Sequence, residues 1–154
     1  MTIRTDQKNE TKPEVLLVDD NPADSDLTSE ALSRCSCPHK VRAVQDGIQA
    51  IEFLRRRGKY SSVHPPDLVI LDLNLPGKDG RAVLAEVKTD PVLKRTPIVI
   101  FSTSQAKSDI KHTMELGANS YVTKPGNLKD FMSTVTSICD YWFKCAVLPS
   151  RKKS

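Results

Sequence analysis

The chain has 154 residues, of which 38% are hydrophobic and 27% charged, and a formal charge of +4, values that fit one globular domain with a sizeable core. No apolar run approaches the roughly 20 residues of a membrane-spanning helix. Residues 1–10 lack the apolar core of a signal peptide, so the expected location is cytoplasmic, with no membrane partner. Positive charge gathers in Arg55–Arg57 with Lys59 and in Arg151–Lys153. Such runs are usually solvated, and without interleaved aromatic residues they do not favour nucleic-acid binding.

Short aliphatic runs alternate with amphipathic segments along the chain. Residues 1–13 are polar and aperiodic, which predicts a flexible lead-in. The predicted strands are Val15–Val18, Val41–Val44, Leu68–Leu71, Pro97–Phe101 and Ser120–Thr123. The predicted helices lie between Pro22 and Cys37, Ile48 and Leu54, Arg81 and Lys88, Ile110 and Leu116, and Asn127 and Phe143.

This strict alternation predicts an α/β fold in which a parallel sheet with right-handed crossovers carries helices on both faces. Leu68–Leu71 is a run of aliphatic residues only, which is typical of a central strand buried on both faces. Val41–Val44 alternates with polar residues and is expected nearer an edge.

Polar residues close four of the predicted strands. Because the carboxyl ends of parallel strands share one edge of the sheet, these residues are expected to meet there. They are Asp19 and Asp20, Asp72, Ser102 or Thr103, and Lys124. Clustered carboxylates repel one another unless they take up a proton or a divalent cation, and oxygen ligands favour Mg²⁺. Magnesium beside a nucleophilic carboxylate and a lysine is suited to phosphoryl transfer.

These strand ends, together with the turn Leu75–Gly80, resemble the receiver domain of two-component response regulators over roughly residues 14–145. The resemblance implies a flavodoxin-like, doubly wound (βα)₅ fold with strand order 2-1-3-4-5. On this basis the chain is divided into a lead-in at 1–13, a receiver domain at 14–146 and a basic tail at 147–154.

The resemblance also implies the roles of the acidic residues. Asp72 would accept the phosphoryl group from the phosphohistidine of a partner kinase. Asp19, Asp20 and Asp72 would hold Mg²⁺, for which Mn²⁺ could substitute, and the backbone carbonyl of Asn74 would be a further ligand. The reaction would be self-catalysed phosphotransfer with autodephosphorylation, so the chain would not be an enzyme acting on a separate substrate.

Further residues take their expected roles from the same resemblance. Lys124 would pair with the phosphoryl group, and the Lys124–Pro125 peptide would be cis. Ser102 would bond a phosphoryl oxygen, although the family more often has Thr there and Thr103 leaves the register open. Tyr121 matches the aromatic residue that rotates inward when Ser102 moves.

The chain is more specifically similar to the single-domain response regulators of cyanobacterial phytochromes, which implies a phytochrome-type sensor histidine kinase as partner. No DNA-binding output domain is expected after the last predicted helix. A symmetric homodimer is expected through the last two predicted helices and the last strand, with Trp142 and Phe143 as an exposed pair at the contact. The alternative function is a phosphorylation-independent scaffold with a vestigial receiver pocket.

The remaining acidic residues and the cysteines receive structural interpretations. Asp79 is expected to cap the helix that follows Gly80, and an N-cap role is the alternative for Asp19. Caps, turns or surface positions are expected for Asp24, Asp26, Asp46 and Asp67. Structural or incidental thiols that need not pair are expected at Cys35, Cys37, Cys139 and Cys145.

Overall fold

One parallel sheet forms the centre of the computed structural model, which describes residues 12–37 and 39–148. Most of the predicted lead-in and tail therefore lie outside the described residues. The strands are β1 (Glu14–Val18), β2 (Lys40–Val44), β3 (Leu68–Leu71), β4 (Ile98–Ser102) and β5 (Ser120–Thr123). All neighbouring pairs are parallel, in the order β2-β1-β3-β4-β5. The predicted sheet and strand order are confirmed.

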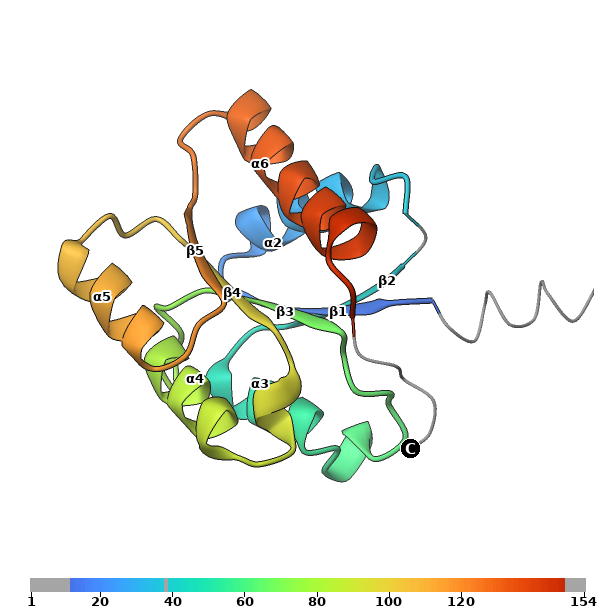
Figure 1. Cartoon of the computed structure of the whole chain (residues 1–154), viewed down its shortest axis with the longest axis vertical. Helices are drawn as coiled ribbons and strands as arrows, with labels where there is room; N and C mark the ends of the chain where they lie inside the picture. Colours follow the sequence, from blue (N-terminus) through green and yellow to red (C-terminus); the bar gives the residue numbers. More distant parts are fainter. Residues whose placement is uncertain (1–11, 38, 149–154) are drawn as a thin grey trace, which may run out of the picture.

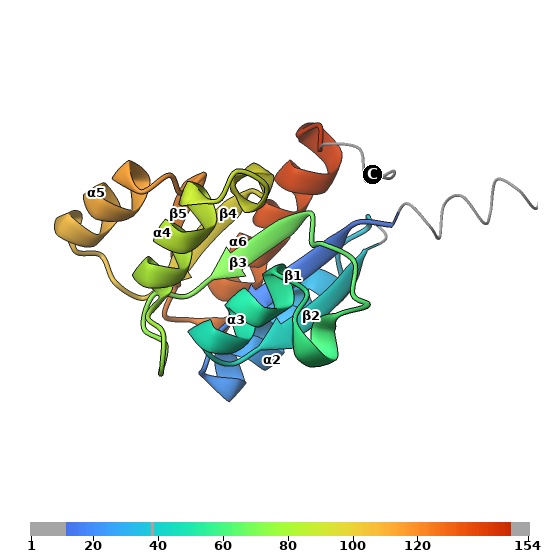
Figure 2. The ribbon, with the colours of Figure 1, turned by 90° about the horizontal axis from the view of Figure 1, so that it is seen from below.

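The helices cover both faces of the sheet. They are α2 (Pro22–Ser33), α3 (Gly47–Leu54), α4 (Gly80–Thr89), α5 (Lys107–Glu115) and α6 (Leu128–Asp140). Figure 1 shows α2 and α6 above the sheet and α3 and α4 below it, with α5 beside the β5 edge. Seen from below in Figure 2, α3 and α4 lie in front of the strands.

The alternation of side chains along each central strand produces two apolar layers, one on each face. In β1, Leu16 and Val18 face the α3–α4 layer, whereas Val15 and Leu17 face the α2–α6 layer. β3 is buried at every position and divides its residues in the same way. Burial on both faces explains why Val15–Val18 and Leu68–Leu71 are aliphatic throughout.

Side-chain caps fix the starts of α2 and α4, which follow the carboxyl ends of β1 and β3. Asn21 accepts a hydrogen bond from the Asp24 amide at the start of α2, where Pro22 fits the first turn. Asp79 caps α4 by accepting from the Arg81 amide, as predicted. The cap of α2 is therefore Asn21, which leaves the Asp19 carboxylate available at the strand end.

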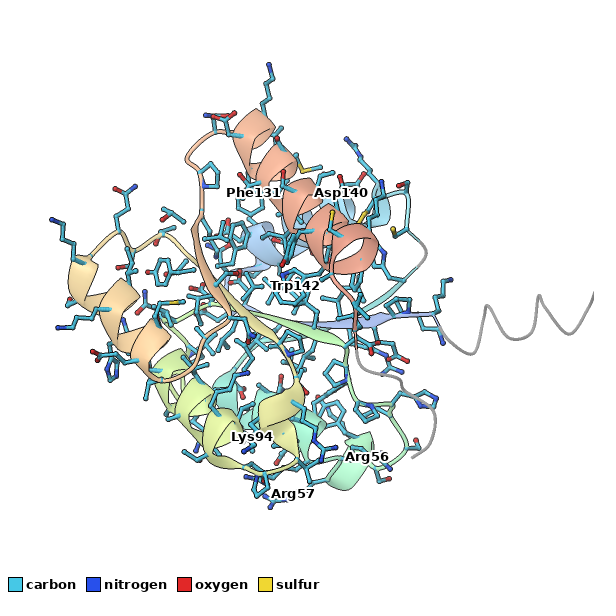
Figure 3. All side chains as sticks on the ribbon, viewed as in Figure 1. Arg56, Arg57, Lys94, Phe131, Asp140 and Trp142 are labelled. Atoms are coloured by element: carbon cyan, nitrogen blue, oxygen red, sulfur yellow. A yellow bond between two sulfur atoms is a disulfide. The ribbon has the colours of Figure 1, made fainter. Side chains whose placement is uncertain are left out.

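The end of α6 departs from the prediction. The apolar spacing predicts one helix through Phe143, but α6 ends at Asp140 and a π-helical turn follows at Tyr141–Cys145. This turn rotates Trp142 and Phe143 against the α2–α6 layer, where both are half-buried, and Figure 3 shows Trp142 between α6 and the sheet. The expectation that Trp142 and Phe143 form an exposed pair is therefore wrong. Of the three aromatic residues in this turn, Tyr141 is the exposed one, at 56%.

The cysteines also depart from the expectation. A disulfide joins Cys35, just after α2, to Cys139 in α6, and only Cys37 and Cys145 are free thiols. The two partners are 104 residues apart in sequence. They meet because α2 and α6 pack side by side on one face of the sheet, which cysteine spacing alone does not reveal.

The basic run after α3 is solvated, as predicted. Arg56 and Arg57 are exposed, and Figure 3 shows them with Lys94 on the α3–α4 side of the molecule. Arg55 instead bonds Glu86 and Asp90 at 3.0 and 2.9 Å. Among the helices of the described residues, none is long and apolar enough to cross a membrane.

Candidate phosphoryl-accepting site

Three carboxylates meet where β1 and β3 end. Val18 of β1 is the register partner of Leu71 of β3, so the residues that follow each strand, Asp19 and Asp72, become neighbours. Oxygens of Asp19, Asp20 and Asp72 all lie within 4.8 Å of one another. Asp19 and Asp72 are buried, whereas Asp20 is exposed. The predicted convergence of the acidic strand ends is present.

Lys124 reaches this cluster from the end of β5. Its Nζ lies 2.8 Å from Asp19 Oδ2 and 3.2 Å from Asp72 Oδ2, and its side chain is 3% exposed. Nζ also lies over the ring of Phe101 in β4, 5.8 Å from its centroid. The lysine thus bridges the two buried carboxylates.

Burial and charge act in opposite directions on this pair. Burial lowers the pKa of Lys124, but hydrogen bonds to Asp19 and Asp24 and the charges of Asp72 and Asp19 outweigh it and raise the pKa above its ordinary value. Burial raises the pKa of Asp19, and the bonds from Lys124 and from the Asn21 amide only partly offset that effect. The site therefore keeps the Lys124 ammonium charged beside the Asp19 carboxylate, whose desolvation is incompletely compensated.

Asp24 is the residue of this site that the sequence interpretation missed. Its Oδ2 lies 2.9 Å from Lys124 Nζ, so the ammonium contacts a third carboxylate besides Asp19 and Asp72. The signal in the sequence is position: the first turn of α2 follows directly on the β1 end, so a carboxylate there lies over the same edge. Asp26, on the same helix, is exposed as expected.

The backbone around Asp72 is tightly held. The Leu73 amide donates to Asp72 Oδ1 at 2.8 Å, and the Gly80 amide donates to the Leu73 carbonyl at 2.8 Å. A Cβ at Gly80 would overlap the Asp72 carbonyl oxygen and lie 2.7 Å from Leu73 Cα. The predicted turn therefore needs glycine here because α4 starts directly against the backbone of Asp72.

The hydroxyl that closes β4 is Ser102. It is fully buried as the last residue of β4, whereas Thr103 is exposed after the strand; the phosphoryl-bonding role of Ser102 stays a prediction. Its Oγ accepts from the Ser104 amide at 3.3 Å. Tyr121 is half-buried on β5, and its hydroxyl donates to the Ser104 carbonyl at 2.8 Å. Ser102 and Tyr121 thus contact the same short loop.

Two further predicted features concern the backbone. The carbonyl of Asn74, predicted as a metal ligand, belongs to an exposed residue two positions after Asp72; its role as a ligand stays a prediction. The predicted cis Lys124–Pro125 peptide is wrong for this structure, since no cis bond occurs within residues 12–37 and 39–148. The trans form is the intrinsically favoured one, by roughly 0.5–1 kcal/mol before proline.

A doubly wound sheet with carboxylates after two neighbouring strands and a lysine after the edge strand defines a receiver-type site. Comparison with known proteins agrees: the response regulator receiver domain matches residues 15–136. The chain belongs to the response regulator receiver domain family.

The chain is similar to response regulators linked to phytochromes. It is 42% identical to response regulator Rcp1 of Synechocystis sp. over 146 residues, which cover 95% of this chain and 99% of that protein. The phosphorylated cyanobacterial phytochrome response regulator RcpA is 47% identical, with a TM-score of 0.87 over 90% of this chain and 99% of that one. The Mn²⁺-bound form of Rcp1 is 43% identical, with a TM-score of 0.86 and the same coverage.

Proposed function

We propose that the chain accepts a phosphoryl group on Asp72 from the phosphohistidine of a phytochrome-type sensor histidine kinase, in the cytoplasm. The observation that carries this proposal is the Lys124 ammonium, 3.2 Å from Asp72 and 2.8 Å from Asp19 in a buried setting. A buried cation at a carboxylate nucleophile can neutralise the negative charge that a phosphoryl group brings. The similarity to RcpA and Rcp1 supports the choice of kinase class.

The residues present fit a divalent cation. Asp19, Asp20 and Asp72 offer oxygens within 4.8 Å of one another, and an all-oxygen donor set suits a hard ion. These three carboxylates and the Asn74 carbonyl would hold Mg²⁺, or Mn²⁺ in its place, and the Mn²⁺-bound Rcp1 structure supports this assignment. When bound, the ion would supply charge neutralisation for the carboxylates and the phosphoryl oxygens.

The protein residues perform the transfer as follows. A carboxylate oxygen of Asp72 attacks phosphorus, an O–P bond forms, and the N–P bond of the phosphohistidine breaks. The imidazole nitrogen keeps the electron pair of the broken bond and takes up a proton. Lys124 places positive charge on the phosphoryl oxygens as the group arrives, and the buried setting strengthens this attraction. The product is an acyl phosphate on the protein itself, so no separate substrate is turned over.

Phosphorylation would then alter the surface near β4 and β5. Ser102 Oγ would turn toward the phosphoryl group and give up the 3.3 Å bond from the Ser104 amide. Tyr121 is tied to the same loop by its 2.8 Å bond to the Ser104 carbonyl, so a movement of that loop changes the α5–β5–α6 face. We propose this face as the contact of a symmetric homodimer, with Tyr141 and Trp142 at its rim beside β5. Phe143 stacks on His39 next to β2 and lies away from this face.

The proposed function is tested by intact-mass measurement after incubation with acetyl phosphate, with and without Mg²⁺. Addition of one phosphoryl group to the wild type, dependent on Mg²⁺ and absent from Asp72→Asn, is the expected result. Asp26→Asn, which removes an exposed carboxylate from α2, is the matched control and should label as the wild type does. Equal labelling of Asp72→Asn would refute the phosphoacceptor assignment, and no labelling of any variant would favour the scaffold alternative. Light scattering of both forms tests the dimer.

A further inference from the structure

Lys124 shares its ammonium with a carboxylate outside the candidate metal cluster. Asp24 Oδ2 lies 2.9 Å from Nζ, close to the 2.8 Å of the contact with Asp19. Asp24 belongs to the first turn of α2, where its amide is fixed by the Asn21 cap. The carboxylates that could share an ion are Asp19, Asp20 and Asp72, without Asp24. Neither the phosphoacceptor nor the metal assignment therefore accounts for the Asp24 contact.

All donors of the ammonium are engaged. A lysine ammonium has three N–H donors, and Nζ has three carboxylate partners, on Asp19, Asp24 and Asp72. A phosphoryl group on Asp72 can receive a donor from Lys124 only if the ammonium gives up or weakens one of these bonds. Formation of the phosphoprotein thus requires a rearrangement at Nζ.

The contact with Asp24 is the one that is released at least cost. The Asp19 side chain is 2% exposed, so its carboxylate would be left buried without its cation. The Asp24 side chain is 25% exposed, and water can hydrate its carboxylate once the lysine leaves. The bond to Asp72 holds the ammonium at the residue that is phosphorylated, so the bond to Asp24 is the one to be given up.

We propose that Asp24 is a positioning residue that holds the Lys124 ammonium in the unphosphorylated protein and slows phosphorylation, because its bond must break before Lys124 can serve the phosphoryl group. This inference rests on the proposed function of Asp72. With acetyl phosphate as donor, an Asp72 oxygen attacks phosphorus, the bond from phosphorus to the acetate oxygen breaks, and acetate leaves with the electron pair. Asp24 takes no part in the bond changes and acts only through Lys124.

Removing the Asp24 charge should therefore speed the reaction. Asp24→Asn is expected to raise the second-order rate constant for labelling by acetyl phosphate, at saturating Mg²⁺, by roughly three- to tenfold, a modest factor because the lost charge-assisted bond is partly exposed. Asp24→Ala should change the rate in the same direction. Asp24→Glu keeps the charge on a longer side chain and should return the rate toward that of the wild type.

Asp26→Asn is the matched control because it removes the same charge from the same helix at an exposed position without a contact to Lys124. The melting temperature of each variant separates this role from a structural one, since a residue needed only for folding would lower both the melting temperature and the rate. A rate for Asp24→Asn and Asp24→Ala that is no higher than that of Asp26→Asn overturns the inference. If the wild type itself takes up no phosphoryl group, the proposed function fails and the inference fails with it.

Discussion

Replacing Lys124 by methionine should destabilise the metal-free protein more than any surface substitution. The side chain is 3% exposed and neutralises Asp19 and Asp72 within a buried site. Breaking a buried ion pair by removing one partner costs about 3–5 kcal/mol, because the other charge stays buried without compensation. We expect a loss of that size in the free energy of unfolding at pH 8, measured by urea denaturation at an unchanged m-value.

The loss should depend on pH and on metal in a defined way. Without Lys124, burial and the charge of Asp72 raise the pKa of Asp19 above the unfolded value of 3.8, and only the bond from the Asn21 amide still lowers it. A raised carboxyl pKa destabilises the native state above the folded pKa, and this penalty fades as pH falls through that value. The variant should therefore approach the wild type on acidification, and at pH 8 Mg²⁺ should restore part of the loss by binding the carboxylates.

Lys129→Met is the control for Lys124→Met, since Lys129 is exposed on α6; it should stay within about 0.5 kcal/mol of the wild type. If Lys124→Met unfolds at the same urea concentration as Lys129→Met at pH 8 without metal, the ion pairs of Lys124 with Asp19 and Asp72 do not stabilise the fold. A loss that grows on acidification would equally contradict the assignment of the buried charge to the carboxylates.

Three further predictions concern the surrounding structure. Gly80→Ala should cost about 3 kcal/mol or more in unfolding free energy and slow labelling by acetyl phosphate, because the new methyl group overlaps the backbone of Asp72. Gly126→Ala should change neither quantity, because the space around Gly126 is open. Under non-reducing conditions Cys35→Ser should lower the unfolding free energy by about 3–5 kcal/mol, since it opens a covalent loop of roughly 100 residues, and Cys37→Ser should not. Hydrogen bonds from Ser104 and Arg81 lower the pKa of Asp109, so the stability that this carboxylate contributes is present above pH 3.8 and is lost below it. The melting temperature of the wild type should therefore fall more steeply between pH 5 and about 3 than that of Asp109→Asn, and an equal fall in both would contradict this.

Much of the site could be predicted because one rule of parallel sheets determines it. Residues that follow the strands share an edge, so Asp19, Asp72 and Lys124 could be brought together from their positions after aliphatic runs. The assignment of Asp79 as a cap followed from its place before a helix start, and the structure agrees. These inferences need only local patterns and the topology.

What could not be predicted depends on how helices lie on the sheet. The contact of Asp24 with Lys124 requires the first turn of α2 to fold over the strand end. The Cys35–Cys139 bond requires α2 and α6 to be neighbours. The half-burial of Trp142 depends on a π-helical turn that the i+3 and i+4 spacing of apolar residues does not distinguish from a continuing α-helix.

The disulfide has a consequence for the covalent connectivity of the protein. Between Cys35 and Cys139 the backbone and the cross-link form a closed ring that contains four of the five strands, β2 to β5. A protease that cuts once within this ring, for example in the exposed stretch around Ser61 and Ser62, leaves both pieces joined through sulfur. A nicked chain would therefore migrate as one molecule until it is reduced, and the sheet would keep all its strands.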